Sequence, residues 1–292
     1  MPIFTWRLTL KLTPTSDTSI AVSGGRVGVV IVTCRPNLEL LHDSIRAVCL
    51  QVAHGVVVDN GSPDQDEIRE LLPPNFSMIE NPDNLGVGVA LNQGIRHLLT
   101  DPSLGWILTL DQDTVVSADY LQCLLQQLGQ FPGRDSIGLI AGLSSRSSSH
   151  SKRLIRTEYV MTAGSLVRAD VFARTKYRED FFVDQIDYDF CNQLRTNTYG
   201  ILVFDWPMFK HELGAARQLI GRPVRYESSS RYYLIVRNST ILLRERRIPV
   251  GVYVQQVLRW GIAVCVFENP IRAIRAFHRG ARDALRKRLT LP

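Results

Sequence analysis

The stretch Trp106–Val116, WILTLDQDTVV, decides both the fold and the site that the sequence predicts. Its first part, Trp106–Leu110, is an apolar run typical of a buried strand. Asp111 and Asp113 follow directly, where open α/β sheets bind ligands outside the carboxyl ends of their strands. Alternation along an extended segment would send Gln112 to one side and both aspartates to the other. Two carboxylates placed in this way predict a site for Mg²⁺ or Mn²⁺ with coordination positions left open for a substrate diphosphate.

Strand and helix patterns alternate before this stretch and predict the rest of the sheet. Short β-branched or apolar runs predict strands, and apolar residues at helical spacing predict the helices between them. The expected strands are Val27–Thr33, Val56–Val58, Phe76–Glu80 and Trp106–Leu110, and the expected helices are Leu38–Gln51, Glu67–Leu72 and Val89–Leu99. This alternation favours parallel strands joined by right-handed crossovers, in an α/β fold with a Rossmann-like sheet.

Each predicted strand ends in a polar loop, and these loops should meet at one edge of the sheet to form a crevice. The loops are Thr33–Arg35, Asp59–Ser62, Asn84–Gly88 and Asp111–Asp113. The pair Gly86 and Gly88 follows a strand, but the third glycine of the dinucleotide-binding fingerprint is missing. A hydride-transfer enzyme is therefore disfavoured. Taken alone, Asp59-Asn60-Gly61 could equally be a plain turn.

Charge is distributed unevenly along the 292 residues, whose formal net charge is +6. Residues 1–209 hold 17 Lys and Arg against 23 Asp and Glu, whereas residues 210–292 hold 17 against 5. An anionic partner should therefore meet the last third of the chain. No zinc-finger spacing or RNA-binding aromatic motif supports nucleic acid, which makes an anionic membrane surface the better candidate. The five cysteines are scattered and predict reduced thiols rather than disulfides.

Two polar segments are expected to carry little regular structure. Residues 1–25 contain no apolar core or cleavage site of a signal peptide, and Thr13–Gly25 is rich in Thr, Ser and Gly, which predicts a flexible leader. Ser144–Ser151, SSRSSSHS, is of low complexity and predicts a mobile loop.

The last 45 or so residues predict a helical extension, residues 246–292. Ile248–Phe267 is largely apolar, but it is near the minimum length for a bilayer span, and its polar residues near the middle argue against one. Asn269-Pro270 then starts a helix with arginines at spacings of three and four: Arg272, Arg275, Arg279, Arg282 and Arg286. Such a basic amphipathic helix suits the headgroups of an anionic membrane, although a solvated face packed on the protein would show the same pattern.

Eight motifs in order resemble glycosyltransferase family 2, and they are most similar to its bacterial rhamnosyltransferase branch. They are VVIVTCRPN, VVVDNGS, NPDNLGVGVALNQGI, WILTLDQD, TAGSL, DFFVDQIDYDFC, HELG and RYYLIVRN, spread over roughly residues 26–245. The resemblance implies a GT-A fold for residues 26–245, which is a Rossmann-like, mixed and mostly parallel sheet flanked by helices, with the C-terminal helical extension outside it.

The resemblance also implies which residues bind the donor. Thr33 and Arg35 would border the nucleotide base, and Asp59 would accept a hydrogen bond from the pyrimidine imide. The residues expected at the ribose and its phosphate are Asn84, Gly86 and Asn92. Asp111 and Asp113 correspond to the metal-binding motif of the family, with Asp113 as the direct ligand.

A second carboxylate group, in FFVDQIDYDFC, implies the general base. Members of the family often have Glu-Asp shortly before an apolar-Cys helix, and here Ile186 replaces the Glu. Asp187 therefore inherits the role of base, and Asp184 remains the alternative. At a helix N-terminus the dipole lowers the pKa of a carboxyl group while neighbouring acids raise it. A plain capping aspartate is the other interpretation.

The remaining site residues are also implied by the resemblance. His211 in HELG would be an additional metal ligand, although a structural histidine is an equal alternative. The residues expected to contact donor phosphates or the acceptor are Arg231, Tyr232 and Arg237, and those expected in an acceptor-side loop are Gly164 and Ser165. Arginine suits phosphate because its planar fork binds two oxygens at once.

Together these observations predict an inverting, metal-assisted glycosyltransferase at the cytoplasmic face of the bacterial inner membrane. The expected donor is dTDP-L-rhamnose, and the expected acceptor is a hydroxyl of a cell-surface glycan, free or lipid-linked, such as lipopolysaccharide, O-antigen or rhamnan. Another family-2 transferase with a galactofuranosyl or hexosyl donor would share nearly every motif. A sugar nucleotidyltransferase should have a Gly-rich loop after the first strand, which CRPNLEL lacks. A non-enzymatic membrane-binding module would leave the clustered aspartates unexplained, and a homo-oligomer stays open.

Overall fold

The computed structural model describes residues 25–145, 151–211, 216–219, 222–286 and 289. The predicted leader lies outside these residues except for Gly25, and most of the predicted loop Ser144–Ser151 lies outside them as well.

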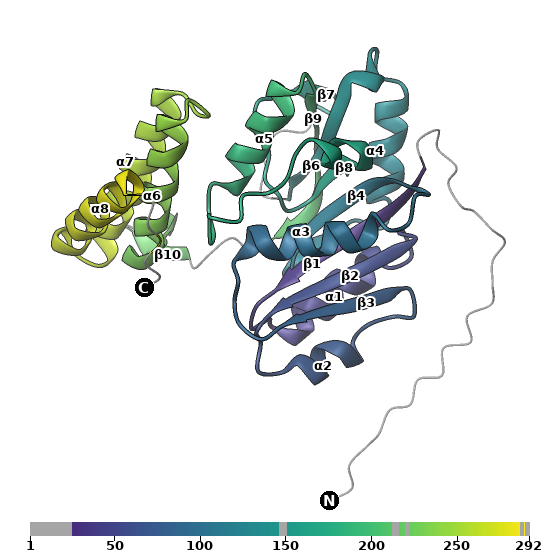
Figure 1. Cartoon of the computed structure of the whole chain (residues 1–292), viewed down its shortest axis with the longest axis horizontal. Coiled ribbons are helices and arrows are strands. Elements are labelled where there is room, and N and C mark those ends of the chain that lie inside the picture. The colour runs from purple at the N-terminus through teal and green to yellow at the C-terminus, as the bar shows by residue number, and fades with distance from the viewer. Residues whose placement is uncertain (1–24, 146–150, 212–215, 220–221, 287–288, 290–292) are drawn as a thin grey trace, which may run out of the picture.

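A nine-stranded mixed sheet forms the centre of the protein, in the order β3-β2-β1-β4-β8-β6-β9-β5, with β7 paired to β9 (Figure 1). The strands are β1 (Arg26–Thr33), β2 (His54–Asn60), β3 (Phe76–Asn81), β4 (Leu104–Asp111), β5 (Thr114–Val116), β6 (Ile137–Ser144), β7 (Leu154–Arg156), β8 (Ser165–Arg168) and β9 (Gly200–His211). The first four strands are parallel, as predicted, and β6 is parallel to β9. The antiparallel pairs β4–β8, β6–β8, β5–β9 and β7–β9 make the sheet mixed.

Helices cover both faces of the sheet because its central strands are apolar on both sides. Val29 and Ile31 of β1 pack in the cluster that contains α1 (Leu38–Val48), α2 (Gln65–Glu70) and α4 (Tyr120–Gly129). Val30, between them, packs in the cluster that contains α3 (Val87–Leu98) and α5 (Ile186–Thr196). The predicted α/β fold is confirmed, and the four strands and three helices predicted up to Leu110 have boundaries within three residues of those observed.

Smaller elements complete the chain between α4 and the C-terminal helices. They are the 3₁₀ helices η1 (Arg134–Ser136) and η2 (Ala169–Ala173) and the two-stranded antiparallel ribbon of β10 (Ala216–Leu219) and β11 (Arg222–Arg225).

Three C-terminal helices, α6 (Ser229–Arg244), α7 (Val250–Phe267) and α8 (Pro270–Leu285), pack on one another beside the sheet (Figure 1). The contact between α6 and α8 is close, because a Cβ atom on Gly280 would lie 2.7 Å from the carbonyl oxygen of Tyr233. Helix α6 thus packs with α7 and α8 and also carries Arg231, and the expected boundary at residues 245 and 246 places it with residues 26–245. By length and composition, α7 could cross a membrane, and it is the only such helix among the described residues.

Candidate active site

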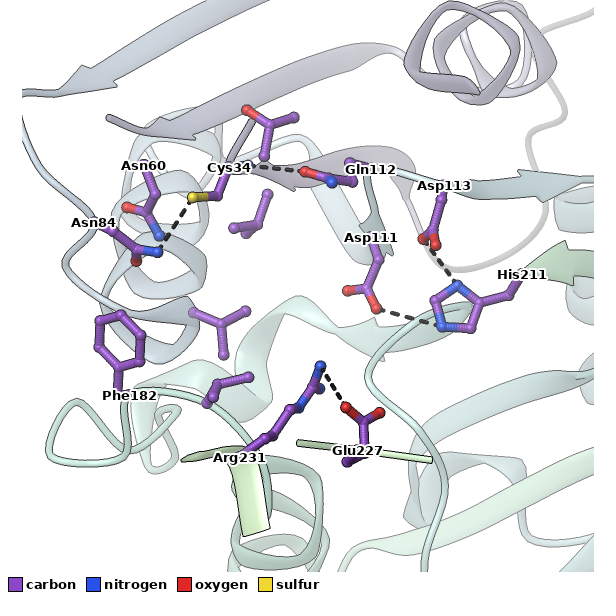
Figure 2. A pocket seen from close by; sticks show the side chains of 14 residues that line it. Cys34, Asn60, Asn84, Asp111, Gln112, Asp113, Phe182, His211, Glu227 and Arg231 are labelled. Atoms are coloured by element: carbon purple, nitrogen blue, oxygen red, sulfur yellow. Dashed lines mark hydrogen bonds and ion pairs between the residues drawn. The ribbon is translucent and has the colours of Figure 1, made fainter. Parts of the chain in front are cut away.

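A cavity of about 390 Å³ opens at the carboxyl ends of β1, β2 and β4, where the sequence predicted a crevice (Figure 2). Its lining comes from segments far apart in the chain: Val32, Thr33, Cys34, Asn60, Asn84, Val87, Asp111, Gln112, Asp113, Phe182, Val183, His211, Glu227 and Arg231. The polar loops of the parallel strands form one part of this lining, and the start of α6 forms another.

Asp111, Asp113 and His211 converge on one side of the cavity (Figure 2). The Nδ1 atom of His211 lies 3.0 Å from a carboxylate oxygen of Asp113, and its Nε2 atom lies 3.7 Å from one of Asp111. One potential ligand atom from each residue lies within 4.8 Å of the others. The pairing of β5 with β9 produces this arrangement, because it places Thr114 opposite His211. Two carboxylates and an imidazole suit Mn²⁺ or Mg²⁺, so the residues fit the ion that the sequence predicted.

Enclosure in the crevice changes the ionisation of Asp111. Burial raises the pKa of Asp111, and the positive charges of His211 and Arg231 oppose that rise. A nearby cation stabilises the ionised form of a carboxyl group most strongly where water solvates its charge poorly. The electrostatics of the cluster therefore agree with its geometry as a cation-binding set.

The turn that follows β4 corrects one sequence prediction. The prediction that Gln112 points away from the two aspartates was wrong, because β4 ends at Asp111 and alternation does not continue through the turn. Gln112 lines the same cavity, and its side-chain oxygen accepts a hydrogen bond of 2.8 Å from the backbone N–H of Cys34. This bond joins the loops that follow β1 and β4.

Arg231 extends into the cavity from the first turns of α6 (Figure 2). Its Nε and one terminal nitrogen donate to the two carboxylate oxygens of Asp184 at 3.0 and 3.1 Å, and Glu227 lies 3.5 Å away on the other side. Burial disfavours the charged guanidinium, but Asp184 and Glu227 outweigh it and raise the pKa of Arg231. Arg231 is therefore a permanent cation held in a fixed orientation.

Asp184 and Gln185 form a strained bend that delivers this carboxylate to Arg231. Both residues have φ of 66°, in the left-handed region that non-glycine residues rarely occupy. The amide of Asn238 on α6 donates to the carbonyl oxygens of Val183 and Asp184 at 2.9 and 3.1 Å. The bend is thus held by α6 at both its backbone and its side chain.

Asp187 lies in the first turn of α5, where the sequence placed it. Burial raises the pKa of Asp187 to about 6, and the negative charge of Asp184 contributes to this rise. The backbone N–H of Tyr188 donates a hydrogen bond of 2.9 Å to the carboxylate of Asp187 and opposes the rise. A carboxylate with a pKa near the working pH is suited to accept a proton. Asp187 has this property, whereas Asp184 is already bound on both oxygens by Arg231.

Asp59, predicted to bind the base, is fully buried at the end of β2. Its two oxygens accept hydrogen bonds from the hydroxyl of Thr33 at 2.8 Å, from the hydroxyl and N–H of Ser62 at 2.5 and 2.8 Å, and from the amide of Gln65 at 2.9 Å. The hydroxyl of Ser62 also accepts a hydrogen bond of 2.7 Å from the backbone N–H of Arg35. Arg35 has a φ angle of 48°. Asp59 therefore fixes the shape of the loops after β1 and β2.

Asn84 and Gly86 shape the neighbouring wall. Asn84 lines the cavity, donates to the sulfur of Cys34 at 3.2 Å and accepts the N–H of Gly86 at 2.9 Å. Gly86 has φ of 88°, and a Cβ atom there would lie 2.8 Å from the carbonyl oxygen of Phe182. Only glycine can start α3 so close to this loop.

Asn92 lies away from the cavity, which corrects the expectation that it contacts the ribose. Its side chain donates to the carbonyl of Tyr177 at 2.9 Å and to Glu179 at 3.0 Å, and accepts the N–H of Tyr177 at 3.0 Å. Because its hydrogen-bonding groups are used in this way, Asn92 ties the segment around Tyr177 to α3.

Tyr232 and Arg237 are also outside the cavity, although both lie on α6 beside Arg231. The hydroxyl of Tyr232 donates to the carbonyl of Val257 on α7 at 3.1 Å, in a buried contact. Arg237 is 2% exposed and donates to Asn238 at 2.7 Å and to the carbonyl of Asp180 at 3.2 Å. A helix turns about 100° per residue, so positions near Arg231 in sequence face other neighbours.

Gly164 and Ser165 form a buried turn next to β4 rather than part of the cavity lining. Gly164 has φ of +81° and its N–H donates to the carbonyl of Thr109 at 2.9 Å. Ser165 is 1% exposed and donates to the carbonyl of Met161 at 2.5 Å. Both residues support the strand that carries Asp111.

Sequence reasoning missed Glu227, Gln112, Phe182 and Val183 as cavity residues. Glu227 could have been found, since it stands four residues before the predicted Arg231, the spacing of an ion pair on a helix. Gln112 was assigned to the wrong face, as described above. Phe182 and Val183 give no local signal, because an apolar side chain in a loop has no distinctive pattern.

Comparisons with known proteins agree with this geometry. The family described as Glycosyl transferase family 2 matches residues 29–196, which include the strands and loops around the cavity. A relative from Shigella flexneri, dTDP-rhamnosyl transferase RfbF, is 26% identical over 252 residues, covering 78% of this chain and 83% of the relative. The crystal structure of S. aureus TarS 1-349 in complex with UDP-GlcNAc is similar with a TM-score of 0.53, at 13% identity, over 91% of this chain and 82% of that chain.

Proposed function

This chain belongs to glycosyltransferase family 2, and from that premise we propose that it is an inverting transferase that moves L-rhamnose from dTDP-L-rhamnose to a hydroxyl of a bacterial cell-surface glycan. One observation carries the proposal. A single cavity joins Asp111, Asp113 and His211, which could hold a cation, to the fixed cation Arg231. Asp187 does not line this cavity, but it is near enough to Asp111 for the charge of Asp111 to raise its pKa. A nucleoside diphosphate needs positive charge on both sides of its phosphates, and this cavity offers it.

Asp187 acts as the general base in the proposed reaction. It takes the proton from the acceptor hydroxyl as that oxygen attacks the anomeric carbon from the face opposite the diphosphate. The bond between the anomeric carbon and the diphosphate oxygen breaks, the configuration inverts, and the nucleoside diphosphate leaves with the electron pair. Asp187 is the better base because Arg231 already binds Asp184 through both oxygens.

Asp111, Asp113 and His211 would hold Mg²⁺ or Mn²⁺. The bound ion supplies Lewis-acid assistance by offsetting the negative charge that grows on the departing diphosphate. Arg231 contributes in the same direction from the opposite wall, since its charge is permanent and its orientation is fixed by Asp184.

The loops after β1 and β2 hold the nucleotide in this proposal. Thr33 and Asn84 line the cavity and would contact the base and the ribose, while Asp59 holds the loops in shape from beneath. The choice of dTDP-L-rhamnose is supported by the relative named as a dTDP-rhamnosyl transferase, which is 26% identical to this chain.

The proposed acceptor is a glycan at the membrane, and the enzyme would work peripherally at the cytoplasmic face of the inner membrane. This location is supported by the charge of the last third of the chain and by the arginines of α8, which contact anionic lipid in the proposal.

A donor panel tests the proposal most directly. The protein is incubated with dTDP-L-rhamnose, UDP-galactofuranose, UDP-glucose and UDP-GlcNAc, each with Mn²⁺ and with EDTA, and release of nucleoside diphosphate is measured. We expect release from dTDP-L-rhamnose only, and only with the metal. Release from another donor would keep the enzyme class and replace the sugar, whereas no release from any donor, with or without acceptor extract, would contradict the proposed reaction.

A further inference from the structure

Helix α7 exposes a stripe of apolar side chains that runs along its whole length. The residues recur at every fourth position: Val250, Val254, Leu258, Ile262 and Val266, which are 64, 42, 56, 61 and 49% exposed. Helix α8 adds Ile271, Ile274 and Leu285, which are 61, 56 and 63% exposed. These eight make up most of the 13 large hydrophobic residues exposed in the described part of the chain. An apolar surface of this extent marks an interaction site.

The opposite face of α7 is packed against the rest of the protein. Val264 is fully buried against α6, and the carbonyl of Val257 accepts the hydroxyl of Tyr232. On α5, the hydroxyl of Tyr188, next to the proposed base, accepts a 2.8 Å bond from the amide of Gln256. A helix attached in this way has only one face available to lipid, so α7 cannot be surrounded by a bilayer without leaving these contacts.

The polar residues of α7 lead to the same conclusion. The 18 residues of α7 span about 27 Å at ~1.5 Å per residue, so a crossing helix would have no length to spare in a hydrocarbon core of about 30 Å. Gln255 and Arg259 lie on the exposed side of the helix, near its middle. These positions would lie deep in a crossing helix, whereas in a helix that lies flat their long side chains can reach the headgroups.

The charges around the stripe are complementary to anionic lipid. Residues 246–286 contain eight arginines and two acidic residues. Arg272 forms an ion pair with Glu268, Arg282 forms one with Asp283, and both arginine side chains remain more than half exposed. Arg275 and Arg286 are exposed on the same side of α8. An apolar stripe bordered by arginines is the surface of an interfacial helix rather than of a helix that binds a neutral apolar partner.

We propose that α7 and α8 form a bilayer-docking surface, in which α7 lies flat in an anionic leaflet with its apolar stripe inserted at the boundary of headgroups and acyl chains. This inference rests on the membrane location proposed above but not on the proposed chemistry. It assigns insertion to α7, whereas the arginine pattern of α8 had indicated only electrostatic contact.

Glu268 connects the docking surface to the active-site cavity. It lies between α7 and α8, pairs with Arg272, and accepts hydrogen bonds from the hydroxyl of Tyr226 and from the N–H of Ser229 at 2.8 Å. Ser229 is the first residue of α6, whose first turn carries Arg231 into the cavity. Docking would therefore hold the cavity at a fixed distance from the leaflet, which suits an acceptor anchored in lipid.

Vesicle flotation tests the docking surface with the full chain. The vesicles contain phosphatidylglycerol with phosphatidylcholine, or phosphatidylcholine alone. The double variant Leu258→Gln, Ile262→Gln removes the centre of the stripe, and Leu50→Gln, Leu99→Gln, at two other exposed positions, is the matched control. We expect at least about tenfold weaker binding of the α7 variant to anionic vesicles and wild-type binding of the control, because the variant replaces two apolar side chains that would be buried in the leaflet. The protein bound to vesicles should be released by alkaline carbonate.

Each other outcome overturns a defined part of the inference. If the α7 variant binds like the wild type while Arg275→Gln, Arg286→Gln is released, the membrane location stands and insertion of α7 is wrong. If the wild type fails to bind anionic vesicles, the location itself is wrong. Resistance to carbonate would mean that α7 crosses the bilayer. A change in the oligomeric state of the α7 variant without lipid would assign the stripe to a second copy of the chain. Donor turnover, measured in the same samples, reports separately on the chemistry.

Discussion

The sheet and the C-terminal helices use apolar side chains in opposite ways. In β1, Val29, Val30 and Ile31 are completely buried, since helices cover both faces of the strand. In α7, Leu258 and Ile262 are more than half exposed, although the helix is of similar apolar character. The buried side chains of β1 form part of the core beneath the crevice, whereas the exposed side chains of α7 form a surface that water solvates poorly. In the function and location proposed above, the first region performs the chemistry and the second determines where it takes place.

Charge divides the two regions in the same way. Residues 1–209, which contain the sheet, have six more acidic than basic residues, and the rest of the chain has twelve more basic than acidic ones. The acids that matter for chemistry gather at the ends of β4 and the start of α5, while the arginines gather on α8. If the comparison is right, changes in one region should affect turnover and changes in the other should affect location or stability.

The largest effect should follow from Asp113→Ala, in the sheet region. Loss of one of the three ligand groups should lower kcat by roughly 10²–10³, the range typical of losing an electrostatic stabiliser. Turnover would be measured across a Mn²⁺ titration, with Asp119→Ala, an exposed aspartate on the next helix, as the control. Binding to anionic vesicles should not change. Near-full turnover of Asp113→Ala in EDTA would remove the proposed metal role.

Asp187→Asn should come next, with kcat lower by about 10²-fold or more and donor affinity unchanged. Asn keeps the shape of the side chain but cannot accept a proton. Calorimetry with the donor, alongside turnover, separates binding from catalysis. Asp184→Asn is the comparison variant, and it should weaken donor binding by loosening Arg231 rather than remove the base. If Asp184→Asn were inactive and Asp187→Asn active, the base would have to be reassigned.

The pH dependence of the same step gives an independent test. Because burial raises the pKa of Asp187 to about 6, the carboxylate that acts as base is lost as the pH falls through 6. We therefore expect kcat to decline on the acid side with an apparent pKa near 6. A raised pKa also means that the folded state binds this proton more tightly than the unfolded state, so ionised Asp187 lowers stability above pH 6. Asp187→Asn should consequently not melt at a lower temperature than the wild type at pH 7.5.

Much of this arrangement could be predicted from sequence, because it depends on local patterns. The strands, their parallel order and the crevice follow from apolar runs that end in polar loops, and His211 was paired with the aspartates by motif alone. The misplaced residues depend on contacts between distant elements. Asn92 faces a segment more than 80 positions away, and Tyr232 faces α7 only because α6 packs against it. The sequence periodicity of a helix predicts which face is buried, but not which distant segment its polar side chains will contact.

Asn92→Ala tests whether a residue of the sheet region stabilises the fold, as its hydrogen bonds indicate, or binds the donor, as the sequence predicted. The substitution leaves the buried N–H and carbonyl of Tyr177 without their partner, which should lower the free energy of unfolding by about 1–3 kcal/mol. Urea unfolding would measure this loss, and the KM for the donor should remain that of the wild type at a temperature where both are folded. A raised KM with unchanged stability would return Asn92 to the ribose site.

The smallest effect is expected from Tyr232→Phe, in the helical region. This change removes one hydrogen bond, from the tyrosine hydroxyl to the carbonyl of Val257, and keeps the ring packed between α6 and α7. The net contribution of such a bond is about 1 kcal/mol, so urea unfolding should shift by that amount. Donor KM and kcat should not change, because the hydroxyl faces away from the cavity although Arg231 is the adjacent residue. Arg231→Gln, which removes the positive charge at the adjacent position, should instead raise the donor KM. If Tyr232→Phe instead raised the donor KM and left the unfolding curve unchanged, Tyr232 would face the donor. Helix α6 would then belong to the donor site at more than Arg231, and the proposed division between a region for chemistry and a region for location would not hold at this helix.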